Sequence, residues 1–192
     1  MSNSMIVESK GITIDPYFIP AFDLRSGEIA VLSLLSGAYF QEIKTRLINI
    51  LTGKVLNEAL TISQPLTYVP HFRESWIRRN FYPSTVGRYL KKNAQPDHAL
   101  AGKIYEHALI NKRTRMKTLH ESHRQLINLY ATLSNTKHIV FDLIGQGPES
   151  ADIYYRVVKE MVKQGGAAIL LDNFRGINDD CTTYIEMELL RP

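Results

Sequence analysis

The adjacent residues Lys44 and Thr45 are of the types that hold a phosphate group and a magnesium ion. They follow an apolar run and the small residues Ser36-Gly37, an order typical of a strand, a turn and a helix. An anion at such a turn meets the exposed N–H groups and the partial positive charge of the helix start. In the full phosphate-binding loop, G-x-x-x-x-G-K-[ST], the lysine neutralises the phosphates and the hydroxyl holds Mg²⁺. Gly37, Lys44 and Thr45 are therefore the candidate nucleotide-binding residues.

The same stretch departs from this loop at the positions that shape its backbone. Ile43 stands where the glycine before the lysine belongs, and Ala38 stands at the first glycine position. A β-branched side chain cannot adopt the unusual backbone geometry of that glycine without strain. Glu42 adds a negative charge beside the expected phosphates. The alternative interpretation is a lysine and a threonine in the first turn of an ordinary helix.

The elements that would position these residues alternate between strands and helices. Residues 28–35 form an apolar run that predicts a buried strand, and the helical repeat that follows ends at Gly53. Toward the C-terminus, apolar runs at 138–144 and 167–171 flank a second helical repeat, and 184–189 alternates like a half-exposed strand near the end of a sheet. Strands separated by helices predict an α/β fold with a largely parallel sheet and helices on its faces.

The middle of the chain, residues 72–117, lacks strand-like runs and has the apolar spacing of two or three helices. We expect it to form a helical subdomain inserted into an α/β core of residues 1–71 and 118–192. Residues 73–124 hold twelve basic and four acidic residues, a net charge of +8 in a chain whose total is +4. This charge indicates either a solvated helical surface or a docking face for an acidic protein, a phospholipid surface or a nucleic acid.

The composition of the 192-residue chain excludes several classes of protein. Hydrophobic residues make up 44% and charged residues 22%, which is typical of a globular chain and not of a wholly disordered one. The single cysteine, Cys181, excludes an intramolecular disulfide and an all-cysteine metal site. No apolar run is long enough to span a bilayer, and the N-terminus lacks the basic start of a secretory leader. We therefore expect a cytoplasmic protein.

From about Phe22 to Leu190 the sequence resembles the nucleotide-binding domain of ATP-binding-cassette (ABC) ATPases. The resemblance rests on stretches that follow the order of the family's motifs: residues 22–30 resemble the strand before the phosphate loop, 47–53 the helix after it, 68–71 (Tyr-Val-Pro-His) the Q-loop, 119–133 the signature motif and its helix, 139–142 (Ile-Val-Phe-Asp) the Walker B strand, 148–152 the D-loop and 166–173 the strand before the switch residue. The resemblance implies a P-loop-NTPase-like sheet with an inserted helical subdomain, and ATP and Mg²⁺ as cofactors.

The resemblance also implies roles for individual residues. His71 matches the Q-loop glutamine at the nucleotide, although a lone histidine before a helix is also a common structural residue. Asp142 matches the Walker B aspartate, which with Thr45 would hold Mg²⁺. The signature motif, which meets the nucleotide bound by a partner domain, is matched by His120, Glu121, Ser122 and His123. The switch histidine is matched by Asn173.

The departures from the family's pattern fall on the catalytic positions. The residue after Asp142 is Leu143, where the family has a glutamate that orients or deprotonates the attacking water. Asn173 carries no positive charge, and Glu121 would repel a phosphate. No catalytic residue is therefore assigned, and ATP hydrolysis is expected to be impaired or absent.

Three hypotheses of function follow from the sequence. The first is a pseudo-ATPase that pairs with itself or with an ABC ATPase and docks on a membrane permease, at the inner face of the membrane. The second is a working ATPase that uses Lys44, Thr45 and Asp142 for nucleotide and Mg²⁺. The third is a nucleic-acid-binding module that uses interleaved basic and aromatic residues, which are Arg73, Arg78, Arg79 and Arg88 with Trp76, Phe81, Tyr82 and Tyr89. Helical spacing places most of these aromatics on an inner face, so nucleic acid is not the partner that we expect.

Overall fold

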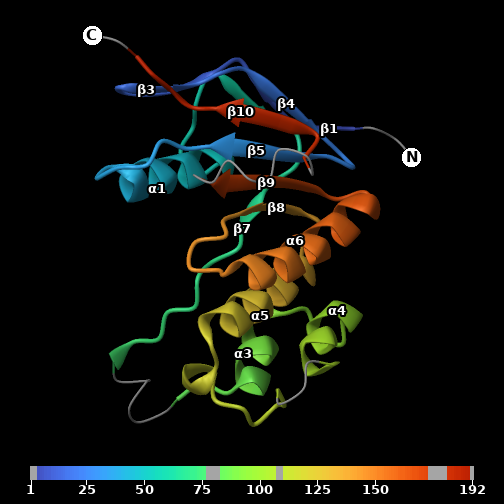
Figure 1. The fold of residues 1–192 in the computed structure, drawn as a ribbon. Helices are drawn as coiled ribbons and strands as arrows, with labels where there is room; N and C mark the ends of the chain where they lie inside the picture. Colours follow the sequence, from blue (N-terminus) through green and yellow to red (C-terminus); the bar gives the residue numbers. More distant parts are fainter. Residues whose placement is uncertain (1–3, 77–82, 107–109, 173–180, 191–192) are drawn as a thin grey trace. The chain divides into compact units, whose positions relative to one another are not determined.

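The computed structural model describes residues 4–76, 83–106, 110–172 and 181–190 (Figure 1). The chain forms two compact units. The core unit consists of Met1–Tyr68, Lys137–Ile144 and Arg156–Pro192, and the helical unit of Val69–Thr136 and Gly145–Tyr155. The range of the helical unit contains the predicted insertion, 72–117, and also 69–71, 118–136 and 145–155, which the prediction assigned to the core. No described helix is both long and apolar enough to cross a membrane.

The core unit is built on a sheet of five parallel strands. In spatial order these are β10 (Thr183–Glu186), β5 (Ile29–Ser33), β9 (Ala167–Asp172), β8 (His138–Phe141) and β7 (Thr67–Tyr68). Every residue of β9 is buried. In β5 and β8 all residues are buried except one end residue of each, Ser33 and His138, which are half-buried. Continuous apolar runs are typical of parallel strands covered on both faces, so the predicted α/β fold with a parallel sheet is confirmed.

Helix α1 (Phe40–Leu51) follows β5 and buries its apolar stripe in the core unit. It ends as the sequence predicts, because Gly53 takes a positive φ of 70° that favours glycine. Helix α6 (Pro148–Lys163) starts in the helical unit and ends in the core unit, ahead of β9. At its end Gly166 lies so close to the chain that a Cβ atom would lie 2.6 Å from the carbonyl oxygen of Lys137.

Two small antiparallel sheets complete the core unit. One has the order β4-β1-β6 and the other the order β11-β3-β2. Their bounds are β1 Met5–Ser9, β2 Ile12–Ile14, β3 Tyr17–Ile19, β4 Phe22–Arg25, β6 Leu60–Ile62 and β11 Glu188–Leu189. The single strand predicted at 184–189 is corrected to two strands in different sheets. The chain leaves the parallel sheet at the buried Met187, whose N–H donates to the carbonyl oxygen of Ser33, and then pairs with β3.

The regular structure described in the helical unit is almost entirely helical. It comprises α3 (Val86–Asn93), α4 (Ala99–Gly102), α5 (Glu121–Leu133), the 3₁₀ turns η1 (Lys103–Glu106) and η2 (Met116–Thr118), and the first half of α6. Thr85 caps the start of α3, because its hydroxyl accepts a hydrogen bond from the N–H of Arg88. The core of this unit includes Val86, Ile104, Met116 and Leu129, which are all fully buried.

Candidate nucleotide site

The turn between β5 and α1 does not have the form that the sequence motif led us to expect. Helix α1 begins at Phe40, four residues before Lys44, rather than at the lysine. The N–H of Phe40 donates to the carbonyl oxygen of Gly37, and that of Ile43 donates to Tyr39, so Ile43 lies inside the first turns of the helix. The second half of the stretch that would wrap a phosphate, residues 40–43, is helical, and the N–H of Ile43 is already bonded there. Gly37 has a positive φ of 150° and is exposed, before the helix start.

The candidate lysine points into the core unit, where it meets the Walker B-like aspartate. The ammonium nitrogen Nζ of Lys44 lies 3.1 Å from Oδ2 of Asp142. The two side chains are 8% and 0% exposed, so this is a buried ion pair. The phenol hydroxyl of Tyr68 donates to the same oxygen at 2.7 Å, and the N–H of Ile144 donates to Oδ1 at 3.2 Å. Both oxygens of the carboxylate are therefore engaged by groups of this chain.

The parallel sheet explains why these side chains meet. Tyr68 is the last residue of β7, and Asp142 directly follows β8, its neighbour in the sheet. Carboxyl ends of parallel strands lie at one edge of a sheet, where ligands of open α/β sheets bind. The resemblance indicated Lys44 and Asp142, but the sequence reasoning gave no role to the Tyr68 hydroxyl. Asp142 closes a short apolar stretch, but Tyr68 follows the polar Thr67, and no local pattern singled it out.

Thr45 is not brought to the aspartate in the way that the motif implies. Its side chain is exposed, and its hydroxyl donates to the carbonyl oxygen of Gln41 one turn earlier at 2.7 Å. Leu143, at the position of the family's water-orienting glutamate, is buried. Asn173 lies outside the described residues. The described geometry thus joins Lys44 to Asp142 and leaves the hydroxyl of Thr45 bonded within its own helix.

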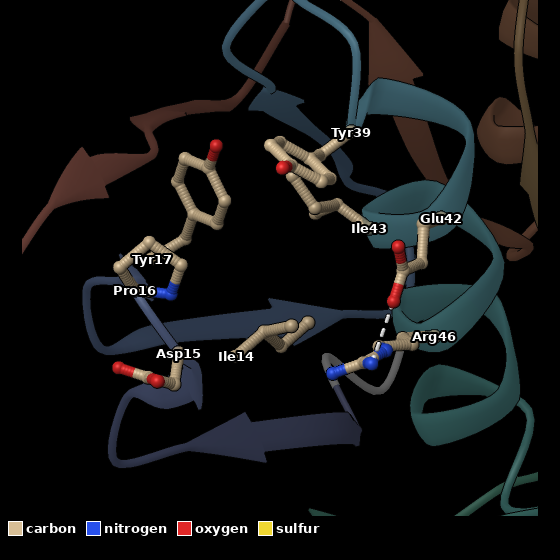
Figure 2. A pocket seen from close by; sticks show the side chains of 8 residues that line it. All are labelled: Ile14, Asp15, Pro16, Tyr17, Tyr39, Glu42, Ile43 and Arg46. Carbon is tan, nitrogen blue, oxygen red and sulfur yellow. Dashed lines mark hydrogen bonds and ion pairs between the residues drawn. The ribbon is translucent and has the colours of Figure 1, made fainter.

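A cavity of about 190 Å³ lies on the exposed side of the first turns of α1, against the turn between β2 and β3. Figure 2 shows Tyr17 and Tyr39 on one side of it and the ion pair between Glu42 and Arg46 on another. The complete lining is Ile14, Asp15, Pro16, Tyr17, Tyr39, Glu42, Ile43 and Arg46. The lining thus contains two carboxylates and one guanidinium group, and that guanidinium is already paired with Glu42 at 2.6 Å. A polyphosphate gains little from such a surface, because the net charge of the lining is negative.

In the helical unit, His71 is bonded to the helix that carries the signature-like residues. Its Nδ1 lies 2.9 Å from Nε2 of Gln125 in α5, and Nδ2 of Asn128 donates to the carbonyl oxygen of Pro70 at 2.7 Å. Gln125 in turn accepts a hydrogen bond from Gln146. These contacts fasten the 70–71 segment to α5. The described residues contain no group of three or more histidine, cysteine or acidic side chains that could hold a metal ion.

The four signature-like residues form the start of α5. His120 precedes the helix and contacts the hydroxyl of Ser122 at 3.1 Å, and Glu121 forms an ion pair with Arg124. Ser122 and His123 line a hollow of about 150 Å³ together with the first turns of α6. A negative charge stands here where the family's motif has glycine, and it is held in place by Arg124 within the same helix.

Comparison with known proteins identifies the fold. No protein-family model matches the sequence, and no curated protein matches it. The structure is similar to an ABC transporter of proposed metal-chelate type in an inward-facing conformation, with a TM-score of 0.75 and 15% identity over 98% of this chain and 82% of that one. A proposed ABC transporter ATP-binding protein from Pyrococcus furiosus gives a TM-score of 0.72 and 14% identity, over 95% of this chain and 97% of that chain.

A third solved structure with the same fold is cbiO1 from Clostridium perfringens, which is part of the ABC transporter complex cbiONQ. It gives a TM-score of 0.67 and 12% identity, over 97% of this chain and 86% of that chain. The chain has the fold of an ABC nucleotide-binding domain, and the resemblance stated from the sequence is confirmed for the fold.

Proposed function

We propose that this chain is a cassette-fold subunit that does not hydrolyse ATP and that acts by pairing with another cassette and docking on a membrane permease. The observation that carries the proposal is the buried ion pair between Lys44 and Asp142. In a working phosphate site the lysine faces phosphate oxygens and the aspartate faces Mg²⁺. Here each of these charges neutralises the other.

The residues present do not fit Mg-ATP in the described arrangement. Binding would first have to separate Lys44 from Asp142, and breaking a buried ion pair costs about 3–5 kcal/mol. That cost alone corresponds to a loss of affinity of roughly 10²- to 10⁴-fold. The start of α1 adds to this cost, because the N–H groups of Phe40 and Ile43 already donate to Gly37 and Tyr39 and would have to leave those bonds to meet a phosphate.

Catalysis is disfavoured independently of binding. Leu143 is buried beside Asp142 and carries no group that accepts a proton or orients a water. Loss of a general base lowers a rate by about 10²- to 10⁴-fold. A subunit with weakened nucleotide binding and no general base is better suited to act as a partner of another cassette than as an enzyme. The proposed pairing with an ABC component is supported by solved structures of this fold, such as cbiO1 of the cbiONQ complex.

The thermal unfolding temperature in the presence of Mg-ATP tests this proposal. A ligand at 100 times its dissociation constant stabilises a protein by about 2.7 kcal/mol, which raises the unfolding temperature by several degrees. We expect about 1 mM Mg-ATP to raise it by less than about 1 °C, while an intact ABC ATPase in the same assay shows the full rise.

The contrary outcome would support the second hypothesis, a working ATPase. The observation in favour of this alternative is that Lys44 and Asp142 do lie together at the edge of the sheet where ligands of such folds bind. On that account the pair opens when nucleotide arrives. A rise of several degrees with Mg-ATP in the wild-type chain that is lost in Lys44→Arg would therefore overturn the proposal.

A further inference from the structure

The helical unit carries a cluster of basic side chains that comes from two segments far apart in the sequence. One segment is α3, and the other is residues 110–118, which run beside it (Figure 1). We call this cluster the α3 patch; it consists of six exposed residues, Arg88, Lys91, Lys92, Lys112, Arg113 and Arg115. Neither 85–93 nor 110–118 contains an acidic residue. The α3 patch therefore gathers six positive charges on two adjacent segments of this unit.

The backbone holds the two segments of the α3 patch in a fixed arrangement. The N–H groups of Val86 and Gly87 donate to the carbonyl oxygens of Thr114 and Lys112 at 2.8 and 3.0 Å. The N–H of Met116 donates to the carbonyl oxygen of Ser84 at 2.8 Å, and Thr85 forms an antiparallel bridge with Arg115. The first N–H groups of α3 are thus used within the chain, so an anion here would be met by side chains rather than by a helix start.

The charges of the α3 patch are not balanced inside the described part of the chain. None of its six side chains forms an ion pair with a described residue. On α3, the residues Arg88, Lys91 and Lys92 have the spacing i, i+3 and i+4, so they share one face of the helix. Like charges on one face repel one another, and an external polyanion relieves that repulsion.

The surroundings of the charges decide between classes of polyanion. Segments 85–93 and 110–118 expose no large hydrophobic side chain. Protein interfaces have an apolar core, and membrane-surface segments insert apolar side chains, so both partners require a feature that is missing here. Contacts to the phosphodiester backbone of a nucleic acid need charge and polar groups alone.

We propose that the α3 patch binds a double-stranded nucleic acid through its phosphate backbone, without reading its sequence. A duplex is favoured over a single strand because single-strand binding relies on exposed aromatic rings on which the bases stack. The aromatic ring of α3, Tyr89, is packed edge-on against Phe72 with ring centroids 5.6 Å apart. The α3 patch is also a different set of residues from the basic and aromatic mixture considered in the sequence, and it shares only Arg88 with it.

The test measures fluorescence anisotropy of a labelled RNA duplex of about 20 base pairs, between about 50 and 200 mM KCl. Six phosphate contacts predict a slope of about −5 for the logarithm of the association constant against that of the salt concentration, which is a loss of about 10³-fold in affinity over this range. A single strand of the same length should bind more weakly than the duplex. A wild-type slope weaker than about −2, or tighter binding of the single strand, would overturn the proposal.

Two charge-reversal variants with the same change in net charge localise the site. Lys112→Glu with Arg113→Glu lies in the α3 patch and should weaken the slope by about 2 units, one for each lost phosphate contact. The matched control, Lys10→Glu with Lys54→Glu, changes exposed residues of the core unit and should leave the slope unchanged. Equal effects of the two variants would mean that net charge alone drives binding, which contradicts the proposal.

Further measurements keep the test decisive if a charge reversal disturbs folding. Lys91→Gln with Lys92→Gln only neutralises exposed helix positions, and it should also weaken the slope by about 2 units. Two further probes carry negative charge but no nucleic acid. Vesicles of phosphatidylcholine with phosphatidylserine represent a membrane surface, and polyglutamate represents an acidic protein. Tighter binding of either probe than of the duplex at equal salt would assign the α3 patch to that partner and overturn the proposal.

Discussion

Lys44 lies buried in the core unit because a carboxylate and a phenol hydroxyl meet there. Burying an isolated ammonium group is costly, and an opposite charge with further hydrogen bonds offsets that cost. Asp142 receives donors from Lys44, Tyr68 and the backbone of Ile144, so its own burial is satisfied on both oxygens. At the scale of the residue, the lysine and the aspartate of the nucleotide-like motifs form a buried ion pair.

Removal of one member of this pair should destabilise the chain strongly. Lys44→Met leaves the buried carboxylate of Asp142 without its counter-charge, and we expect the free energy of unfolding to fall by about 3–5 kcal/mol. The double variant Lys44→Met with Asp142→Asn removes both charges, keeps an amide oxygen as an acceptor for the Tyr68 and Ile144 donors, and should recover part of that loss. Urea denaturation measures both values.

The matched control for this prediction is Lys54→Met, because Lys54 is an exposed lysine of the same unit. Its effect should stay within about 0.5 kcal/mol. A loss below about 1 kcal/mol in Lys44→Met, or no recovery in the double variant, would show that the pair does not stabilise the fold.

At the scale of the element, close backbone approach at one glycine assembles the α3 patch. A Cβ atom on Gly87 would lie 2.9 Å from the carbonyl oxygen of Lys112, too close for the segment beside α3 to stay in place. Glycine is therefore required here because the backbone of Lys112 lies so close, and not because Gly87 has an unusual backbone conformation. The helix loses some intrinsic stability in exchange for this contact.

Gly87→Ala should consequently destabilise the chain, although alanine is the better helix former. Overpacking costs about 1–3 kcal/mol, whereas the gain in helix propensity is about 1 kcal/mol, so the clash dominates. Gly102→Ala is the matched control, since a Cβ there would meet nothing within 4 Å, and it should be neutral or stabilising by up to about 1 kcal/mol. Urea unfolding that shifts both variants in the same direction would contradict this reading of Gly87.

The elements that the sequence predicted correctly are those with continuous or clearly periodic apolar residues. β5, β8 and β9 are short buried runs, and α1 and α6 carry regular apolar stripes. β1, β2, β3 and β6 were missed, because pieces as short as β2 and β3 are stabilised by pairing with each other and with the distant β11, and not by a local pattern. The helical repeat of α1 is visible in the sequence from Glu42, and the helix begins two residues earlier, at Phe40.

The same limit applies to the candidate site. Lys44 and Asp142 could be placed together from the resemblance, since both belong to motifs of one site. The contribution of Tyr68 could not be predicted, because β7 has only two residues and its pairing with β8 is a tertiary contact between segments distant in sequence. The excess of basic residues in the middle of the chain was visible in the sequence, but the meeting of α3 with residues 110–118 depends on Gly87 and on long-range hydrogen bonds.

At the scale of the whole molecule, the two units differ in whether their charged side chains are buried in pairs or exposed. The core unit neutralises Lys44 and Asp142 internally, whereas the helical unit displays the α3 patch to solvent. We propose that a cassette fold with this distribution of charge holds partners rather than turning over nucleotide. The proposed function depends on the first of these features, and the proposed contact with nucleic acid depends only on the second.

The most direct test of the central claim observes the Lys44 ammonium group itself by NMR on protein labelled with ¹⁵N-lysine. A buried, ion-paired ammonium exchanges its protons slowly and gives its own cross-peak, which Lys44→Arg identifies by its absence. We expect this cross-peak to persist at an unchanged position when about 5 mM Mg-ATP is added. A saturable shift or loss of the peak with Mg-ATP would show that Lys44 leaves Asp142 for a phosphate and would contradict the account.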